Sequence, residues 1–202
     1  MSAFRSHATM RHMILTARFG DAVVYAAAAH AGQVKKGTTI PYVSHVLEVA
    51  AMVIAHGGDE DQAIAGLLHD VPEDTGGRTR LDDIRSRFGD SVAVMVDGCT
   101  DSYDNPKPPW RPRKEAYISR IPTHSSATRL VSAADKVANL RAIIDAYKVT
   151  GDALWTRLAG GPDTVWYYRT IAQVFRATER TALTERLDHL VDELLSVTHH
   201  PR

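Results

Sequence analysis

The sequence contains a single cysteine, Cys99, among 202 residues, and this scarcity excludes an internal disulfide framework. One cysteine is typical of a protein in a reducing compartment, so we expect a cytoplasmic location. Neither sign of charge is in excess, because 24 lysines and arginines balance 24 aspartates and glutamates. The basic surplus typical of nucleic-acid-binding and membrane-surface proteins is therefore missing. We expect neither nucleic acid nor membrane as a partner.

Long apolar runs are missing as well. One of the longest, residues 22–29, is far shorter than the roughly 20 residues that a membrane-spanning helix needs. The first 15 residues mix polar and apolar side chains and lack the apolar core of a signal peptide. We find no convincing segment of alternating apolar and polar residues, no internal repeat and no low-complexity tract. These absences argue against transmembrane, secreted, repeat and β-sheet proteins.

What the sequence does contain is helical periodicity along almost its whole length, in a chain that is 44% hydrophobic. The pattern therefore predicts an all-α fold, a multi-helix bundle. Residues 16–200 are expected to form one domain, and residues 1–15 an N-terminal extension whose order the sequence leaves open. The expected helices cover residues 19–31, 42–56, 59–70, 79–88, a segment ending near 98, and 125–147, and two or three more surround a break at 160–162. A proline-rich loop is expected at residues 101–112.

The chemistry of the chain is concentrated in residues 67–74, Leu-Leu-His-Asp-Val-Pro-Glu-Asp. His69 and Asp70 could hold a divalent metal, and Glu73 and Asp74 could handle protons beside it. Since the chain has one cysteine, a metal site must consist of histidine and carboxylate, a donor set that suits manganese, iron, zinc or magnesium. Adjacent residues diverge by about 100° on a helix, so other helices must supply the remaining ligands.

Two residues elsewhere are candidates for those remaining ligands. His45 lies near the start of the helix expected after Pro41, and Asp135 interrupts an apolar stretch of a long helix. A buried aspartate needs a partner, which a metal or a neighbouring arginine would provide. Asn139 follows Asp135 by one turn and could orient a ligand or a substrate. Each residue alone has an ordinary interpretation as a surface or satisfied core residue, and it is their order that points to a metal site.

This order, from His45 through His69-Asp70 to Asp135, resembles that of the HD-domain metal phosphohydrolases. The hydrolase domain of RelA/SpoT-type alarmone enzymes is a closer match, above all in the stand-alone small alarmone hydrolases. The matching segments are residues 30–36, 41–45, 67–70 with 73–75, 88–89, 113–114, 134–136 and 139–141. The resemblance implies a metal-dependent hydrolase that removes pyrophosphate from the 3′ position of guanosine tetra- or pentaphosphate, with a nucleotide as its small-molecule partner.

The resemblance also assigns roles to individual residues. It implies Mn²⁺ as the metal, with other divalent ions as alternatives. The expected metal ligands are His45, His69, Asp70 and Asp135. Glu73 and Asp74 are expected to position or deprotonate the attacking water. The expected substrate-binding residues are Lys35, Lys36, Asn139 and Tyr167, although Tyr167 has core packing as an equal alternative. Arg113 and Lys114 could reach phosphate or form a solvated basic patch.

The chain also departs from the family pattern. Val46 stands where family members often have proline, and Pro72 stands where they usually have valine. Ala138 replaces an aromatic residue or histidine. Pro72 could shift the two acids that follow it, and the other changes could alter base recognition. Adenosine alarmones therefore remain an alternative substrate. Two further alternatives are a different HD nucleotide phosphohydrolase and a non-catalytic nucleotide-binding protein, and the sequence leaves open whether the chain forms a homo-oligomer.

Overall fold

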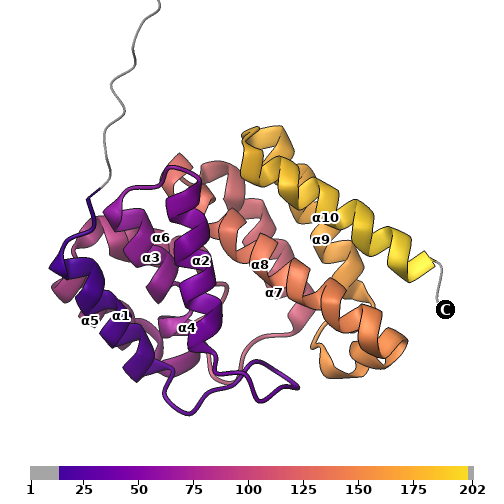
Figure 1. The fold of residues 1–202 in the computed structure, drawn as a ribbon, viewed down its shortest axis with the longest axis horizontal. Coiled ribbons are helices and arrows are strands. Elements are labelled where there is room, and N and C mark those ends of the chain that lie inside the picture. Colours follow the sequence, from indigo (N-terminus) through magenta and orange to yellow (C-terminus); the bar gives the residue numbers. More distant parts are fainter. Residues whose placement is uncertain (1–13, 200–202) are drawn as a thin grey trace, which may run out of the picture.

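Helices account for most of residues 14–199, the part of the chain that the computed structural model describes (Figure 1). The α-helices are α1 (Ala17–Ala29), α2 (Val43–Ala55), α3 (Glu60–Leu68), α4 (Val71–Thr75), α5 (Gly77–Phe88), α6 (Asp90–Cys99), α7 (Trp110–Arg120), α8 (Ser126–Thr150), α9 (Asp163–Thr178) and α10 (Ala182–His199). Two 3₁₀ helices lie at Ile121–Thr123 and Gly151–Arg157. The only β-type pairing within residues 14–199 is an isolated bridge between Val34 and Pro41. The all-α prediction is confirmed, while most of the expected N-terminal extension lies outside the described residues.

Helix ends follow local chemistry that is readable in the sequence. Asp59 caps α3 through a reciprocal pair of hydrogen bonds with Gln62, and Ser125 caps α8. The expected break near Asp70 is present, because α3 ends at Leu68 and α4 begins at Val71. Pro72 lies in the first turn of α4, where its missing amide hydrogen costs no intrahelical bond.

Several predicted boundaries differ from the observed ones by one to three residues, and two of the differences are instructive. The helix expected to start after Thr79 starts at Gly77, because Gly76 and Gly77 adopt positive φ angles of 155° and 62° and turn the chain at once. The proline-rich loop ends before Trp110 rather than at Pro112. Pro112 is accepted in the first turn of α7 for the same reason as Pro72 in α4.

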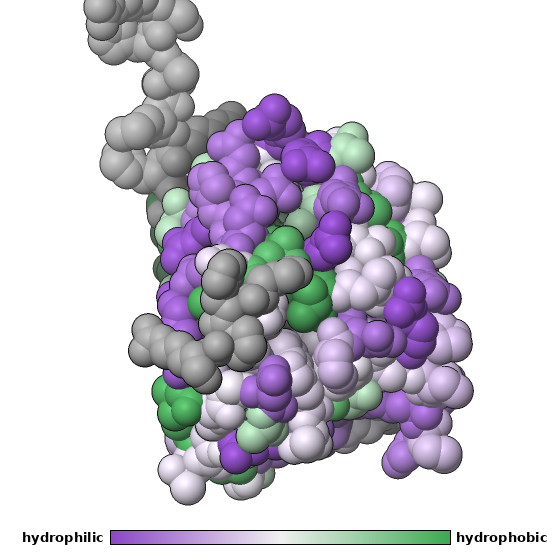
Figure 2. All heavy atoms as spheres, turned by 90° about the vertical axis from the view of Figure 1, so that its right-hand side faces the viewer, coloured by the Kyte–Doolittle hydropathy of each residue, from purple (hydrophilic) through white to green (hydrophobic). Residues whose placement is uncertain are grey.

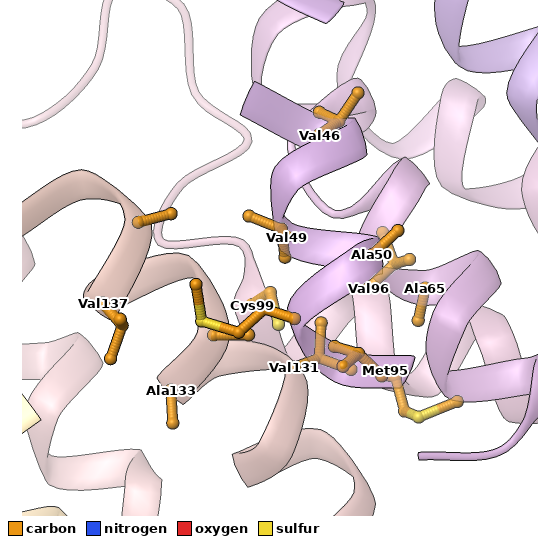
Figure 3. Packing of buried hydrophobic residues seen from close by; sticks show 14 of the residues in the cluster. Val46, Val49, Ala50, Ala65, Met95, Val96, Cys99, Val131, Ala133 and Val137 are labelled. Carbon is orange, nitrogen blue, oxygen red and sulfur yellow. The ribbon is translucent and has the colours of Figure 1, made fainter. Parts of the chain in front are cut away.

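The core that fixes the relative positions of α2, α3, α6 and α8 combines large aliphatic side chains with many valines and alanines. Helix α2 packs against α3 and α8, and α6 packs against both of those helices. Figure 3 places Val49, Val96 and Val131 in the central part of this cluster and Val46 nearer the start of α2, and all four are fully buried. Val46 therefore fills the core at the position where family members often have proline. Small side chains allow close helix approach, so functional groups on these helices are held at short range.

Helices α9 and α10 pack against α8 and each other on the other side of the bundle (Figure 1). At this end of the molecule the visible surface is largely hydrophilic, with a small apolar area in its middle (Figure 2). None of the described helices combines the length and the apolar character that crossing a membrane requires. The candidate metal ligands and acids lie on or directly beside α2, α3, α4 and α8, so these helices are the elements that build the site.

Candidate metal centre and catalytic cleft

Three parts of the bundle bring His45, His69, Asp70 and Asp135 together. His45 lies in the first turn of α2, and Asp135 lies in the middle of α8. His69 and Asp70 occupy the short turn between α3 and α4, and the backbone of both residues keeps right-handed helical φ and ψ angles. One donor atom from each of these four side chains lies within 4.8 Å of the other three. The turn between α3 and α4 therefore contributes two adjacent ligands, and α2 and α8 contribute one each.

The spacing of the donor atoms fits a single metal ion. His45 Nε2 lies 3.1 Å from Asp135 Oδ1 and 3.5 Å from Asp70 Oδ2. His69 Nε2 lies 3.0 Å from Asp70 Oδ2 and 3.4 Å from Asp135 Oδ1. Ligands about 2.1 Å from a common ion are about 3.0 Å apart at octahedral angles and about 3.4 Å apart at tetrahedral angles. A donor set of two imidazoles and two carboxylates at these distances can hold a divalent cation.

Neighbouring groups orient these donors. The Nδ1 atom of His69 is 2.8 Å from the carbonyl oxygen of Gly66, which can only accept, so Nδ1 carries the hydrogen and Nε2 is free to coordinate. Lys136 donates to Asp135 Oδ2 at 2.5 Å, and Asn139 donates to Asp135 Oδ1 at 2.5 Å. The ligand residues are thus pre-positioned by the fold.

The electrostatics of the cluster also favour a cation. Burial by itself would lower the pKa of His69, but the Asp70 and Asp135 carboxylates outweigh it and raise the pKa well above its usual value. Burial would raise the pKa of Asp70, yet the facing histidines hold it well below its usual range. The field of the two carboxylates thus holds positive charge between them. A divalent ion would take the place of those protons.

Glu73 and Asp74 follow directly in α4, within one turn of Asp70. The side chain of Glu73 is 17% exposed, and both of its oxygens are engaged. Lys107 donates to Oε1 at 2.6 Å, and the amide of Asp101 donates to Oε2 at 3.3 Å. Asp74 is less constrained, since within residues 14–199 its carboxylate has only Lys107 as a cation partner, at 3.9 Å. Of the two acids, Asp74 has the freer carboxylate.

The pKa of Asp74 is suited to accepting a proton near neutral pH. Burial and the negative charge of Asp70 raise the pKa of Asp74 to about 7, against an opposing contribution from Lys107. Glu73 also has a raised pKa, caused by burial and by Asp101. A general base works best when its pKa lies near the working pH. Both acids line a cavity of about 730 Å³ together with Arg78, Tyr103 and Lys107, which leaves room for a substrate beside them.

Comparison with known proteins agrees with this geometry. Residues 22–165 match the model of the HD domain family. The chain belongs to the HD-domain family. This HD domain is 33% identical over 177 residues to guanosine-3′,5′-bis(diphosphate) 3′-pyrophosphohydrolase MESH1 of Homo sapiens, covering 84% of this chain and 90% of that protein. It is 31% identical over 159 residues to the Drosophila melanogaster protein of the same name, covering 77% of this chain and 84% of that one.

A solved structure extends the likeness to three dimensions. This HD domain superimposes on a metazoan ortholog of SpoT that hydrolyzes ppGpp with a TM-score of 0.73 and 27% identity. The match covers 90% of this chain and 98% of the other. A crystal structure of lmo0812 from Listeria monocytogenes EGD-e matches with a TM-score of 0.66 and 28% identity, over 75% of this chain and 99% of that one. The resemblance predicted from the motifs is confirmed.

The residues expected to bind substrate lie in different environments. Lys35 is partly buried, and its Nζ lies 4.0 Å from Glu48 of α2, one turn after His45, whereas Lys36 is exposed. The side-chain amide of Asn139 donates a hydrogen bond to Asp135 Oδ1, a geometry that suits the orientation of this candidate metal ligand. Tyr167 is 4% exposed and packs on Trp110 and Tyr168, while its hydroxyl has no hydrogen-bond partner in the described part of the chain. Tyr167 therefore combines core packing with a free polar group.

Several side chains around the centre were not predicted. Lys136 and Lys107 were missed, although Lys136 is adjacent to Asp135 in the sequence and Lys107 lies in the proline-rich loop. Arg113 and Lys114 both donate to Asp101, and their side chains are only 10% and 19% exposed. The interpretation of this pair as a solvated patch was wrong, because Asp101 pairs with both cations and their side chains are largely buried. No sequence signal linked Asp101 to them.

Proposed function

We propose that this chain hydrolyses the 3′-pyrophosphate of guanosine tetra- and pentaphosphate, giving GDP or GTP and pyrophosphate. The observation that carries the proposal is the convergence of His45, His69, Asp70 and Asp135, with Glu73 and Asp74 in the short helix that begins directly after Asp70. The likeness to guanosine-3′,5′-bis(diphosphate) 3′-pyrophosphohydrolases, over 84% of this chain for the human protein, supports the choice of substrate.

The chain's own residues divide the work of hydrolysis. When bound, a divalent ion lowers the pKa of water and offsets charge that develops on phosphoryl oxygens. Asp74 accepts the proton of the attacking water, because its carboxylate is the less constrained of the two acids and its pKa lies near neutrality. Glu73 holds Lys107 at the cleft, where the ammonium group offsets phosphate charge. The bond that breaks joins phosphorus to the ribose 3′ oxygen, which leaves with a proton as a hydroxyl.

The remaining substrate residues are proposed on the same basis. Lys35 and Lys36 lie on the loop before α2 and would contact the nucleotide, as would Asn139 and Tyr167. Mn²⁺ is the proposed ion, since a site of two imidazoles and two carboxylates suits it. We propose a cytoplasmic location, because the single cysteine is buried and fits a reducing compartment.

A direct assay tests the function. Purified protein loaded with Mn²⁺ is expected to convert guanosine tetraphosphate to GDP and pyrophosphate, and chelation of the metal should abolish turnover until Mn²⁺ is restored. Chromatography of the nucleotides and a pyrophosphate assay measure both products. The panel should also contain the adenosine alarmone and simple nucleoside monophosphates. The metal ligands and the two acids act on the phosphate, so they do not by themselves select the base.

Each member of the panel discriminates one alternative. Cleavage of nucleoside monophosphates alone would replace the proposal by a nucleotidase. Binding of alarmones without turnover would replace it by a nucleotide-binding protein that keeps the fold. Preference for the adenosine compound would keep the reaction and change the base.

The rate is expected to depend on pH through Asp74. Since the base form of Asp74 is required, kcat should rise with pH and reach a plateau above the pKa of this group. That pKa is about 7 in the metal-free site. A bound cation offsets the charge of Asp70 and lowers the pKa, so the acidic limb should lie at or below pH 7. Steady-state kcat at saturating metal between pH 5 and 9 measures it. A kcat that falls as pH rises from 5 to 7 would contradict a base in this position.

A further inference from the structure

The two carboxylates of the candidate metal centre are supported unequally. Asp135 accepts hydrogen bonds from Lys136 and Asn139, one on each oxygen. Asp70 stands at the break between α3 and α4, and its side chain makes no capping hydrogen bond to α4. Its side chain is also more exposed, at 20% against 6% for Asp135. Asp70 therefore needs another group to fix its orientation.

Tyr42 is that group. Its hydroxyl lies 2.5 Å from Asp70 Oδ2, the same oxygen that faces His45 and His69. A carboxylate can only accept, so the phenol donates. Apart from the two histidines of the cluster, no other side chain in the described part of the chain forms a hydrogen bond or ion pair with Asp70. The orientation of this ligand thus depends on one hydroxyl group.

The position of Tyr42 is itself well determined. Its amide donates to the carbonyl of Gln33 at 2.9 Å, and its ring packs on His30 with ring centres 4.9 Å apart. His30 is 3% exposed and contacts the side chain of Gln33 at 2.8 Å. The loop before α2 is therefore tied to the metal centre through an aromatic side chain that has little freedom to move.

We propose that Tyr42 is a positioning residue that orients the Asp70 carboxylate for metal binding. The hydroxyl donates to Oδ2, the oxygen that also lies 3.5 Å from His45 Nε2 and 3.0 Å from His69 Nε2. Groups that hydrogen-bond to metal ligands raise metal affinity because they reduce the reorganisation that binding requires. This role rests on the proposed metal centre and not on the identity of the nucleotide.

The test is the affinity of the full-length protein for Mn²⁺ itself. Tyr42→Phe keeps the ring and its packing on His30 while removing the hydroxyl. We expect the variant to bind Mn²⁺ about ten- to a hundred-fold more weakly than the unchanged protein. Metal-free protein is titrated calorimetrically, or in competition with a fluorescent chelator, and circular dichroism melting of the metal-free form shows whether the fold is retained.

Tyr25→Phe is the matched control. Tyr25 also donates to an aspartate, Asp83 at 2.7 Å, but on the surface helices α1 and α5, so its loss should leave Mn²⁺ affinity unchanged. The rise in melting temperature at a fixed Mn²⁺ concentration gives a second measurement, because weaker binding should make this rise smaller for Tyr42→Phe than for the unchanged protein. Equal affinity of Tyr42→Phe and the unchanged protein would overturn the role of Tyr42 alone. Absence of metal binding in the unchanged protein would overturn the metal centre as well.

Discussion

Replacing Asp70 by asparagine should remove tight divalent-metal binding and lower kcat/KM at least about a thousand-fold, because the metal brings the pKa of bound water from about 15.7 to about 7. Asp70 faces both histidines, at 3.0 and 3.5 Å, as Asp135 also does, so its charge acts directly on the other donors. The unchanged protein should gain thermal stability on addition of Mn²⁺, whereas the variant should not. Calorimetric titration, melting curves and turnover together measure the effect.

Two comparisons make this result specific. Asp82→Asn makes the same chemical change at a position that is 72% exposed on α5, and it should leave metal binding and turnover unchanged. Asp135→Asn should also abolish metal binding, but it should destabilise the metal-free protein as well, since the buried Lys136 would lose its charge partner. Retention of full affinity for Mn²⁺ by Asp70→Asn would exclude Asp70 as a ligand.

Replacing Asp74 by asparagine should lower kcat by about a hundred- to ten-thousand-fold while metal affinity stays within a few-fold of the original value. Asparagine keeps the size of the side chain but cannot accept the proton of the attacking water. The acidic limb of the pH profile should disappear with the carboxylate, because the group of pKa about 7 is gone. Steady-state kinetics between pH 5 and 9, with metal affinity measured in parallel, separates the base from the ligand set.

The neighbouring acid provides the comparison. Glu73→Gln removes the charge that holds Lys107 at 2.6 Å, so we expect KM to rise together with a smaller loss of kcat. Asp90→Asn, at a position that is 87% exposed in the first turn of α6, serves as the neutral control. If Asp74→Asn kept the original kcat and Glu73→Gln lost it, the base would be Glu73.

Most of the fold was predictable because its signals are local. Asp59 and Ser125 cap helices through side-chain bonds to the amides that follow, and Pro72 ends the helix that precedes it. The helix starts at Gly77 and Trp110 were placed too late, because the sequence at each of these positions is compatible with more than one starting residue. Helix α7 was not predicted because its residues are mostly polar and carry no clear apolar period.

Local sequence patterns were enough to predict an all-α chain and the residue types of a metal centre. Helical periodicity and the His-Asp and Glu-Asp pairs can be recognised from residues that are close together in the sequence. Only the tertiary structure brought the donors of His45 and Asp135 to within 4.8 Å of those of His69 and Asp70, because small core residues such as Val46 and Val49 let the helices approach closely. The same packing decided which distant groups support the site, because Tyr42 and Lys107 bond to partners that lie 28 and 34 positions away in the sequence. Such contacts depend on distance in space, and residue order does not encode that distance.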